Sequence, residues 1–93
     1  METATLYAYQ ISPGNDDLLY FTETLEQCQA AALEQRRDFI ENDPDEGELA
    51  AMAVYRCEMK MPDQQTLLRV LNDETTLVEA CVVERKLVAL VTD

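Results

Sequence analysis

The sequence predicts a single α+β domain, residues 1–93, in which about four mainly antiparallel strands form a sheet with helices packed on one face. Residues 24–41 have a clear helical period, whereas the segment that starts at Val54 alternates with a period of two. Turn-forming residues also cluster between two short apolar segments near the start of the chain. These observations predict the element order β-β-α-β-α-β.

The chain opens with a predicted β-hairpin. Thr3–Ile11 is rich in Tyr, Leu and Thr and contains neither Gly nor Pro, which is typical of a strand. Ser12–Asp17 then gathers Pro, Gly, Asn and Asp within six residues, which indicates a turn. We expect a second short strand over Leu18–Phe21, paired with the first.

The first predicted helix covers Thr24–Glu41. Thr24 and Gln27 have the spacing of a capping box, in which each side chain accepts a backbone N–H of the first turn. At 100° per residue, the apolar side chains gather within an arc of about 140°. The residues on this predicted core face are Leu25, Cys28, Ala32, Leu33, Phe39 and Ile40.

The second half begins with a predicted strand that has Tyr55, Cys57, Met59 and Met61 on one face. Pro62 ends this strand and suits the first turn of a helix. That short helix has an apolar stripe and ends near Asn72–Asp73. The stripe consists of Leu67, Leu68 and Leu71.

Thr75–Val83 allows two interpretations. Thr76 and Glu79 have capping-box spacing, which favours a helix. Three valines in the same segment favour a strand, because β-branched side chains lose freedom in a helix. The closing strand is predicted over Leu87–Val91.

Composition restricts the classes of partner. Nineteen acidic residues against seven basic ones give a net charge of −12. Residues 1–48 hold twelve acids and two bases, while residues 49–93 hold seven and five. This charge opposes binding to nucleic acid and to anionic membranes, and it favours basic protein partners. In the competing interpretation, the acidity only keeps a small protein soluble.

The sequence lacks membrane-spanning and export segments, and it lacks the common catalytic motifs. Its longest apolar run, Leu49–Tyr55, is far shorter than a membrane span, and the N-terminus has no basic start, so we expect a cytoplasmic protein. The chain has no histidine, a single serine and two glycines, which leaves no Ser-His or Cys-His dyad and no phosphate-binding loop. The adjacent carboxylates Asp16–Asp17 and Asp73–Glu74 are the nearest catalytic candidates, and we expect them to be solvated in polar loops. We therefore expect neither an enzyme nor a cofactor. Cys28, Cys57 and Cys81 form no C-x-x-C pair and are predicted to be buried free thiols.

The acidic residues within positions 41–48 suggest a metal site, since oxygen-rich loops hold Ca²⁺. The spacing of a calcium-binding EF-hand loop fails there. With Asp43 as position one, Gly47 falls at position five and Val54 at position twelve, where Gly at six and Glu at twelve are needed. We expect a solvated turn and no metal.

Arg36 lies in the middle of the apolar arc of the predicted helix. One interpretation is that its methylene groups cover the edge of the core while the guanidinium reaches water or a carboxylate. The other is that the guanidinium holds an anion or a partner's carboxylate in a groove beside the sheet.

Together, these features predict a small acidic binding or regulatory module that contacts a protein partner. The candidate partner-binding residues are Asp43, Asp45, Glu46, Glu48 and Arg36. The alternative is a binder of metal or a small anion that uses the 41–48 loop or a groove near Arg36. Mimicry of nucleic acid is a weaker alternative, supported by charge alone. A homodimer also stays open, because the small residues Ala30 and Ala31 would allow a second helix to approach.

Overall fold

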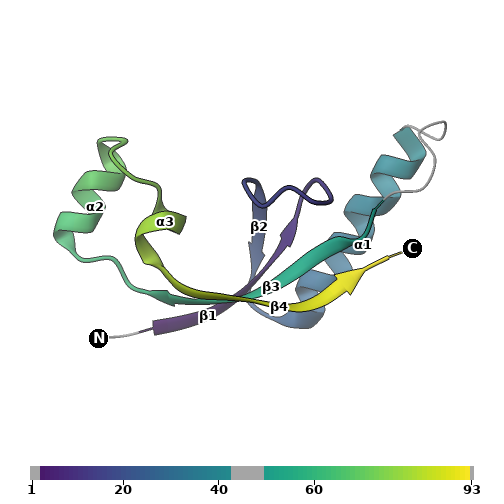
Figure 1. Ribbon diagram of the computed structural model, residues 1–93, viewed down its shortest axis with the longest axis horizontal. Helices are drawn as coiled ribbons and strands as arrows, with labels where there is room; N and C mark the ends of the chain where they lie inside the picture. The colour runs from purple at the N-terminus through teal and green to yellow at the C-terminus, as the bar shows by residue number, and fades with distance from the viewer. Residues whose placement is uncertain (1–2, 43–49, 93) are drawn as a thin grey trace.

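A four-stranded antiparallel sheet with the strand order β2-β1-β3-β4 organises the computed structural model (Figure 1). The structure describes residues 3–42 and 50–92. Its elements are β1 (Thr3–Gln10), β2 (Leu19–Thr22), α1 (Leu25–Asn42), β3 (Met52–Lys60), α2 (Gln64–Leu71), α3 (Leu77–Cys81) and β4 (Val82–Val91). The predicted α+β class and element order are confirmed, with one additional short helix before the last strand.

The start of α1 follows the predicted capping pattern with one change of partner. Thr24 Oγ1 accepts the backbone N–H of Gln27 at 3.1 Å, as a helix N-cap does. The side chain of Gln27, however, accepts the N–H of Glu23 at 3.3 Å instead of the N–H of Thr24. Both bonds satisfy donors that the first turn would otherwise leave unpaired.

The segment that the sequence left ambiguous contains both predicted structures in succession. Thr76 Oγ1 accepts the N–H of Glu79 at 3.1 Å and so caps the short helix α3. The chain then becomes extended at Val82, five residues before the predicted start of the closing strand at Leu87. The capping signal was therefore correct for the first half of this segment, and the valine signal for the second.

The core lies between α1 and one face of β1 and β3. Cys28 and Ala32 of α1 are fully buried against Tyr9, Met52 and Val54 of the sheet. Because Cys28 and Ala32 are small and one helical turn apart, they let the helix approach the strands closely. Leu25, Leu33 and Phe39 are only partly buried at the border of this cluster. The predicted core face of the helix is thus correct except at Ile40, which is 41% exposed, and its most buried apolar part is formed by small residues.

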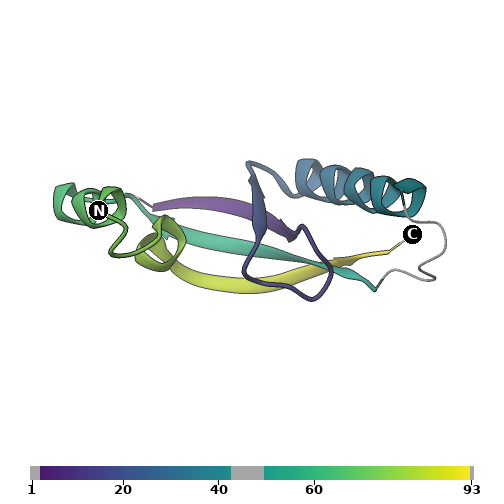
Figure 2. The same cartoon turned by 90° about the horizontal axis from the view of Figure 1, so that it is seen from above.

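The helix α2 has no comparable packing. None of its residues is buried, and its predicted apolar stripe is exposed, with Leu71 at 76%. In Figure 1 the segment containing α2 and α3 lies at one end of the sheet and α1 at the other. Figure 2 shows that the long strands run from one end to the other. The radius of gyration is 15.1 Å, whereas a compact domain of this length has about 12 Å. The molecule is elongated, and only one end has a well-packed core.

Met52 provides a test of this core, because its side chain is fully buried against α1. Met52→Ala should lower the free energy of unfolding by about 2–5 kcal/mol, since truncation removes buried apolar surface and leaves a cavity. Glu34→Ala, on the exposed side of α1, should change it by no more than about 0.5 kcal/mol. Urea denaturation of both variants measures the difference. Equal midpoints would contradict the packing of α1 on the sheet.

Candidate binding site

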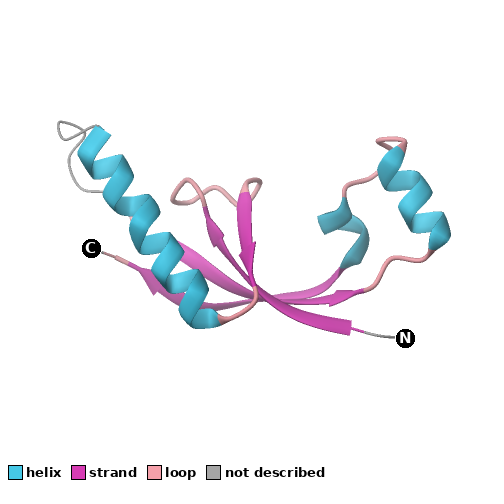
Figure 3. Cartoon of the chain, turned by 180° about the vertical axis from the view of Figure 1, so that it is seen from behind, coloured by secondary structure: helices cyan, strands magenta, loops and turns pink. Residues whose placement is uncertain are grey.

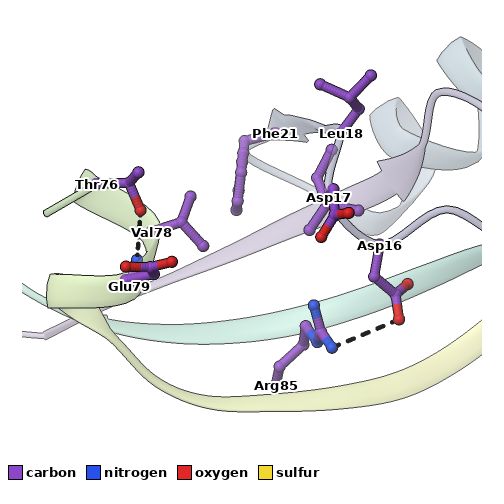
Figure 4. Close-up of a pocket in the computed structure, with 9 residues that line it drawn as sticks. Asp16, Asp17, Leu18, Phe21, Thr76, Val78, Glu79 and Arg85 are labelled. Atoms are coloured by element: carbon purple, nitrogen blue, oxygen red, sulfur yellow. Dashed lines mark hydrogen bonds and ion pairs between the residues drawn. The ribbon is translucent and has the colours of Figure 1, made fainter.

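A hollow of about 410 Å³ opens between the turn that joins β1 to β2 and the helix α3 (Figure 4). Figure 3 shows the two bordering segments from the opposite side, with the hairpin between the two groups of helices. We call this region the acidic hollow, because three of its residues are acidic and one is basic. Its lining residues are Asp16, Asp17, Leu18, Leu19, Phe21, Thr76, Val78, Glu79 and Arg85.

The side-chain amide of Gln10 holds the turn of the hairpin against the sheet. Gln10 Oε1 accepts the N–H groups of Gly14 and Ala53, both at 3.0 Å, and its Nε2 donates to Asp16 Oδ1 at 2.7 Å. Gly14 has φ +82°, a left-handed conformation that glycine adopts without strain. Gln10 is only 5% exposed, so its hydrogen bonds satisfy polar groups that would be costly to leave unpaired. The turn therefore holds Asp16 beside β3 and β4.

Asp16 is the centre of a polar network on this side of the sheet. Its Oδ1 also accepts the hydroxyl of Tyr55 at 2.7 Å, and its Oδ2 lies 3.6 Å from Nη2 of Arg85. The guanidinium carbon of Arg85 lies 4.7 Å from the ring centre of Tyr55, in the geometry of a cation–π contact. The hydrogen bond from Tyr55 is the main cause that lowers the pKa of Asp16, followed by the bond from Gln10. The same bond raises the pKa of Tyr55.

The other two acidic residues of the hollow, Asp17 and Glu79, have free carboxylates among the described residues: no described base forms an ion pair with either. Both residues are exposed. Figure 4 shows Phe21 between Val78 on one side and Asp17 on the other, so apolar walls stand next to the free carboxylates. This combination suits a ligand that has an apolar stem and a cationic end, such as the side chain of lysine or arginine.

The residues that the sequence predicted as partner-binding lie elsewhere. Asp43, Asp45, Glu46 and Glu48 fall outside the described residues. Arg36 is 1% exposed, and its Nη1 donates to the carbonyl of Ala50, next to the start of β3. The guanidinium is therefore buried and does not lie in open water, while the predicted contact with a carboxylate stays a prediction. A role for Arg36 toward a ligand stays a prediction.

The acidic hollow itself was missed in the sequence. Asp16 and Asp17 were assigned to a solvated turn, and Glu79 to a helix cap. The residues of this site lie in segments about sixty positions apart, and the contact depends on how the turn folds across the sheet. Two local patterns place parts of the site, namely the turn signal at Ser12–Asp17 and the capping signal at Thr76 and Glu79, but neither indicates that the two parts meet.

The three cysteines are free and buried, as predicted. Burial raises the pKa of the Cys28 and Cys57 thiols. Within residues 3–42 and 50–92, no group of acidic, cysteine or histidine side chains could hold a metal ion. The expected absence of a metal site stays a prediction, and the acidic segment Asp43–Glu48 lies outside these ranges.

Comparison with models of protein families, with curated proteins and with solved structures finds no match for this chain. In the part of the chain that the structure describes, no helix is long and apolar enough to cross a membrane. The functional argument therefore depends on the geometry of the site.

The network around Asp16 predicts a shift that NMR can measure. In Tyr55→Phe, the pKa of Asp16 should rise toward its ordinary value, because the main hydrogen bond to its carboxylate is lost. The stability that ionised Asp16 contributes is present above the ordinary aspartate pKa and is lost as the pH falls through the lowered one. Asp63 is the internal control, since the N–H of Thr66 lowers its pKa far from Tyr55. Carboxyl ¹³C titration should show a change at Asp16 and none at Asp63.

The thiols provide a second test of the burial of the sheet residues. A thiol reagent at neutral pH should modify Cys28, Cys57 and Cys81 slowly in the native protein and rapidly in denaturant, because all three are buried. Mass spectrometry after timed quenching gives the rate for each residue. Fast modification of Cys57 in the native state would contradict the burial of its thiol and would make it a candidate nucleophile.

Proposed function

We propose that this chain is a protein-binding module without catalytic activity, and that its acidic hollow receives a lysine or arginine side chain of the partner. The observation that carries the proposal is the position of two free carboxylates, Asp17 and Glu79, beside the apolar walls formed by Phe21 and Val78. The apolar walls match the methylene stem of a basic side chain, and the carboxylates match its charge.

The charges of the hollow favour a cation over an anion. Arg85 is the one basic residue in its lining, and Asp16 already pairs with it on the side of Tyr55. An entering anion would meet the two remaining carboxylates, whereas an entering ammonium or guanidinium group would be attracted by both. The hollow therefore selects for positive charge.

The surface around the hollow extends this preference. All seven acidic residues within residues 3–42 are exposed, while one of the two bases there, Arg36, is buried. The negative potential of this surface would attract a basic partner from a distance and raise its association rate. The alternative of a small-anion site near Arg36 has less support, since the described hydrogen bond of its guanidinium goes to a backbone carbonyl.

A peptide titration tests the proposal. A short alanine-rich peptide that carries arginines should shift the ¹⁵N-amide resonances of Asp17, Phe21, Val78 and Glu79 most strongly. The same peptide with glutamates in place of arginines should produce no shifts. Replacing both free carboxylates, in Asp17→Asn with Glu79→Gln, should weaken binding about 5- to 30-fold, since each exposed ion pair contributes up to about 1 kcal/mol. Binding should also weaken as salt shortens the Debye length from about 10 Å at 0.1 M to about 3 Å at 1 M.

The matched control is the variant in which Asp43, Asp45, Glu46 and Glu48 are all neutralised. It removes four negative charges and substitutes none of the described residues that line the hollow, so the peptide should bind somewhat more slowly but with the same pattern of shifted residues. If this control loses binding and the hollow variant keeps it, the acidic segment is the partner site and the hollow is not. Shifts spread evenly over all exposed acids would also contradict a defined site.

A further inference from the structure

Besides the acidic hollow, the described residues form an apolar groove. It lies on the opposite side of α3 from the hollow. This groove of about 290 Å³ runs between the helical segment and the ends of β1 and β3. We call it the α2 groove; its lining residues are Ala4, Leu6, Met59, Lys60, Met61, Pro62, Leu67, Leu77 and Cys81. No residue lines both this groove and the acidic hollow. A substitution in one of the two surfaces can therefore be made without replacing a lining residue of the other.

The helix beside this groove needs a partner to be stable. α2 has eight residues and none is buried. Isolated helices shorter than about 12–15 residues are marginal in water, and most gain their stability from packing an apolar face. The apolar face of α2 exists, because Leu67, Leu68 and Leu71 share one side of the helix and are 45%, 51% and 76% exposed. An apolar face of this kind indicates an interface.

The accessible surface of the chain agrees with its elongated shape. A compact monomer of 10.6 kDa exposes about 5,500 Å², while this chain exposes 6582 Å². The excess of roughly 1,100 Å² belongs to the whole elongated chain and does not by itself locate an interface. A specific interface buries about 800 Å² of each partner, so a second copy would have to cover the exposed face of α2 together with the groove.

From these observations we infer that two copies of this chain form a dimer in which α2 of each copy packs into the α2 groove of the other. A two-fold interface requires a surface that is complementary to itself. The α2 surface meets this requirement, because the exposed side chains of Leu68 and Leu71 share one face of α2 with Leu67, which lines the groove. In this dimer, the exposed face of α2 in each copy fills the α2 groove of the other copy.

The distribution of charge agrees with a second copy as the occupant. Two chains with a net charge of −12 repel each other unless they meet where the charges balance. Residues 50–92 contain six acids and five bases, and α2 itself carries a single charge, Arg69. Residues 3–42 contain seven acids and two bases, so contact through the first half would be opposed. Seven of the nine residues that line the α2 groove belong to the nearly neutral half, and the two from the first half, Ala4 and Leu6, are uncharged.

The outer edge of β4 is the rival surface for self-association, since Leu87 and Leu90 are exposed there at 53% and 62%. Two features oppose its use. Glu84, Arg85 and Lys86 interrupt the apolar residues, and the pairing with β3 shifts register twice along the strand. Charges and register irregularities are devices that keep edge strands from pairing with other chains. Leu90→Asp is therefore a suitable control for Leu71→Asp, because it adds the same charge at another exposed leucine, 62% against 76% for Leu71.

Sedimentation velocity over a roughly hundredfold range of protein concentration tests the dimer. The wild-type chain should sediment at twice its monomer mass at the upper end of the range. Leu71→Asp should weaken the dimer at least about 30-fold, the effect of truncating a central interface residue. Leu90→Asp should leave it unchanged. A wild-type chain that stays monomeric, or a dimer that only Leu90→Asp disrupts, would overturn the proposal.

Hydrogen exchange in the wild-type chain tests the same interface without any substitution, in case Leu71→Asp unfolds α2. On dilution, the amides of α2 should lose protection as the dimer dissociates, while the amides of α1 around Cys28 and Ala32 should keep theirs. Protection of α2 that does not depend on concentration would overturn the proposal. Neither readout depends on Asp17 or Glu79, so the basic-partner proposal can fail while this one holds, and the reverse.

Discussion

The contact of two small α1 side chains, Cys28 and Ala32, with β1 and β3 is the interaction on which the rest of the structure depends. Both are fully buried, and they bring the helix backbone close to Tyr9 and Val54. A close approach of this kind gives dense packing from few residues. It also concentrates the core at one end of an elongated sheet (Figure 1). The other end keeps apolar side chains that α1 cannot reach, and the two candidate binding surfaces border this less covered part.

The hydrogen bonds of Gln10 are the second constraint, because they position the turn that borders the acidic hollow. Its amide accepts two backbone N–H groups and donates to Asp16, which fixes the turn over β3 and β4. Asp16 then holds Arg85 and Tyr55, so the remaining carboxylates of the hollow have no nearby described cation. The capacity of the hollow for an external cation thus follows from a buried hydrogen-bond network.

Local patterns were sufficient for most of the fold. The helical period of residues 24–41 and the turn residues at 12–17 were read correctly to within one or two residues. The extent of β4 was underestimated, since the charges Glu84, Arg85 and Lys86 hide the alternation that precedes Leu87. The site was not predicted, because the contacts of Asp16 with Tyr55 and Arg85 join segments 39 or more residues apart. Periodicity and short motifs do not indicate which residues so far apart in the sequence come into contact.

Charge and apolar surface are divided between the two halves of the chain in a way that allows both proposed interactions to occur together. Of the exposed large apolar residues, Met61, Leu67, Leu68, Leu71 and Leu77 cluster around α2, where the charges nearly balance. The exposed acids of residues 3–42 lie on the other half. If two copies join through α2, the acidic residues that line the hollow are not among the residues that line the contact. A dimer would then present two acidic hollows, and a partner with two basic segments would bind it more tightly than a monomer, because the second contact becomes intramolecular.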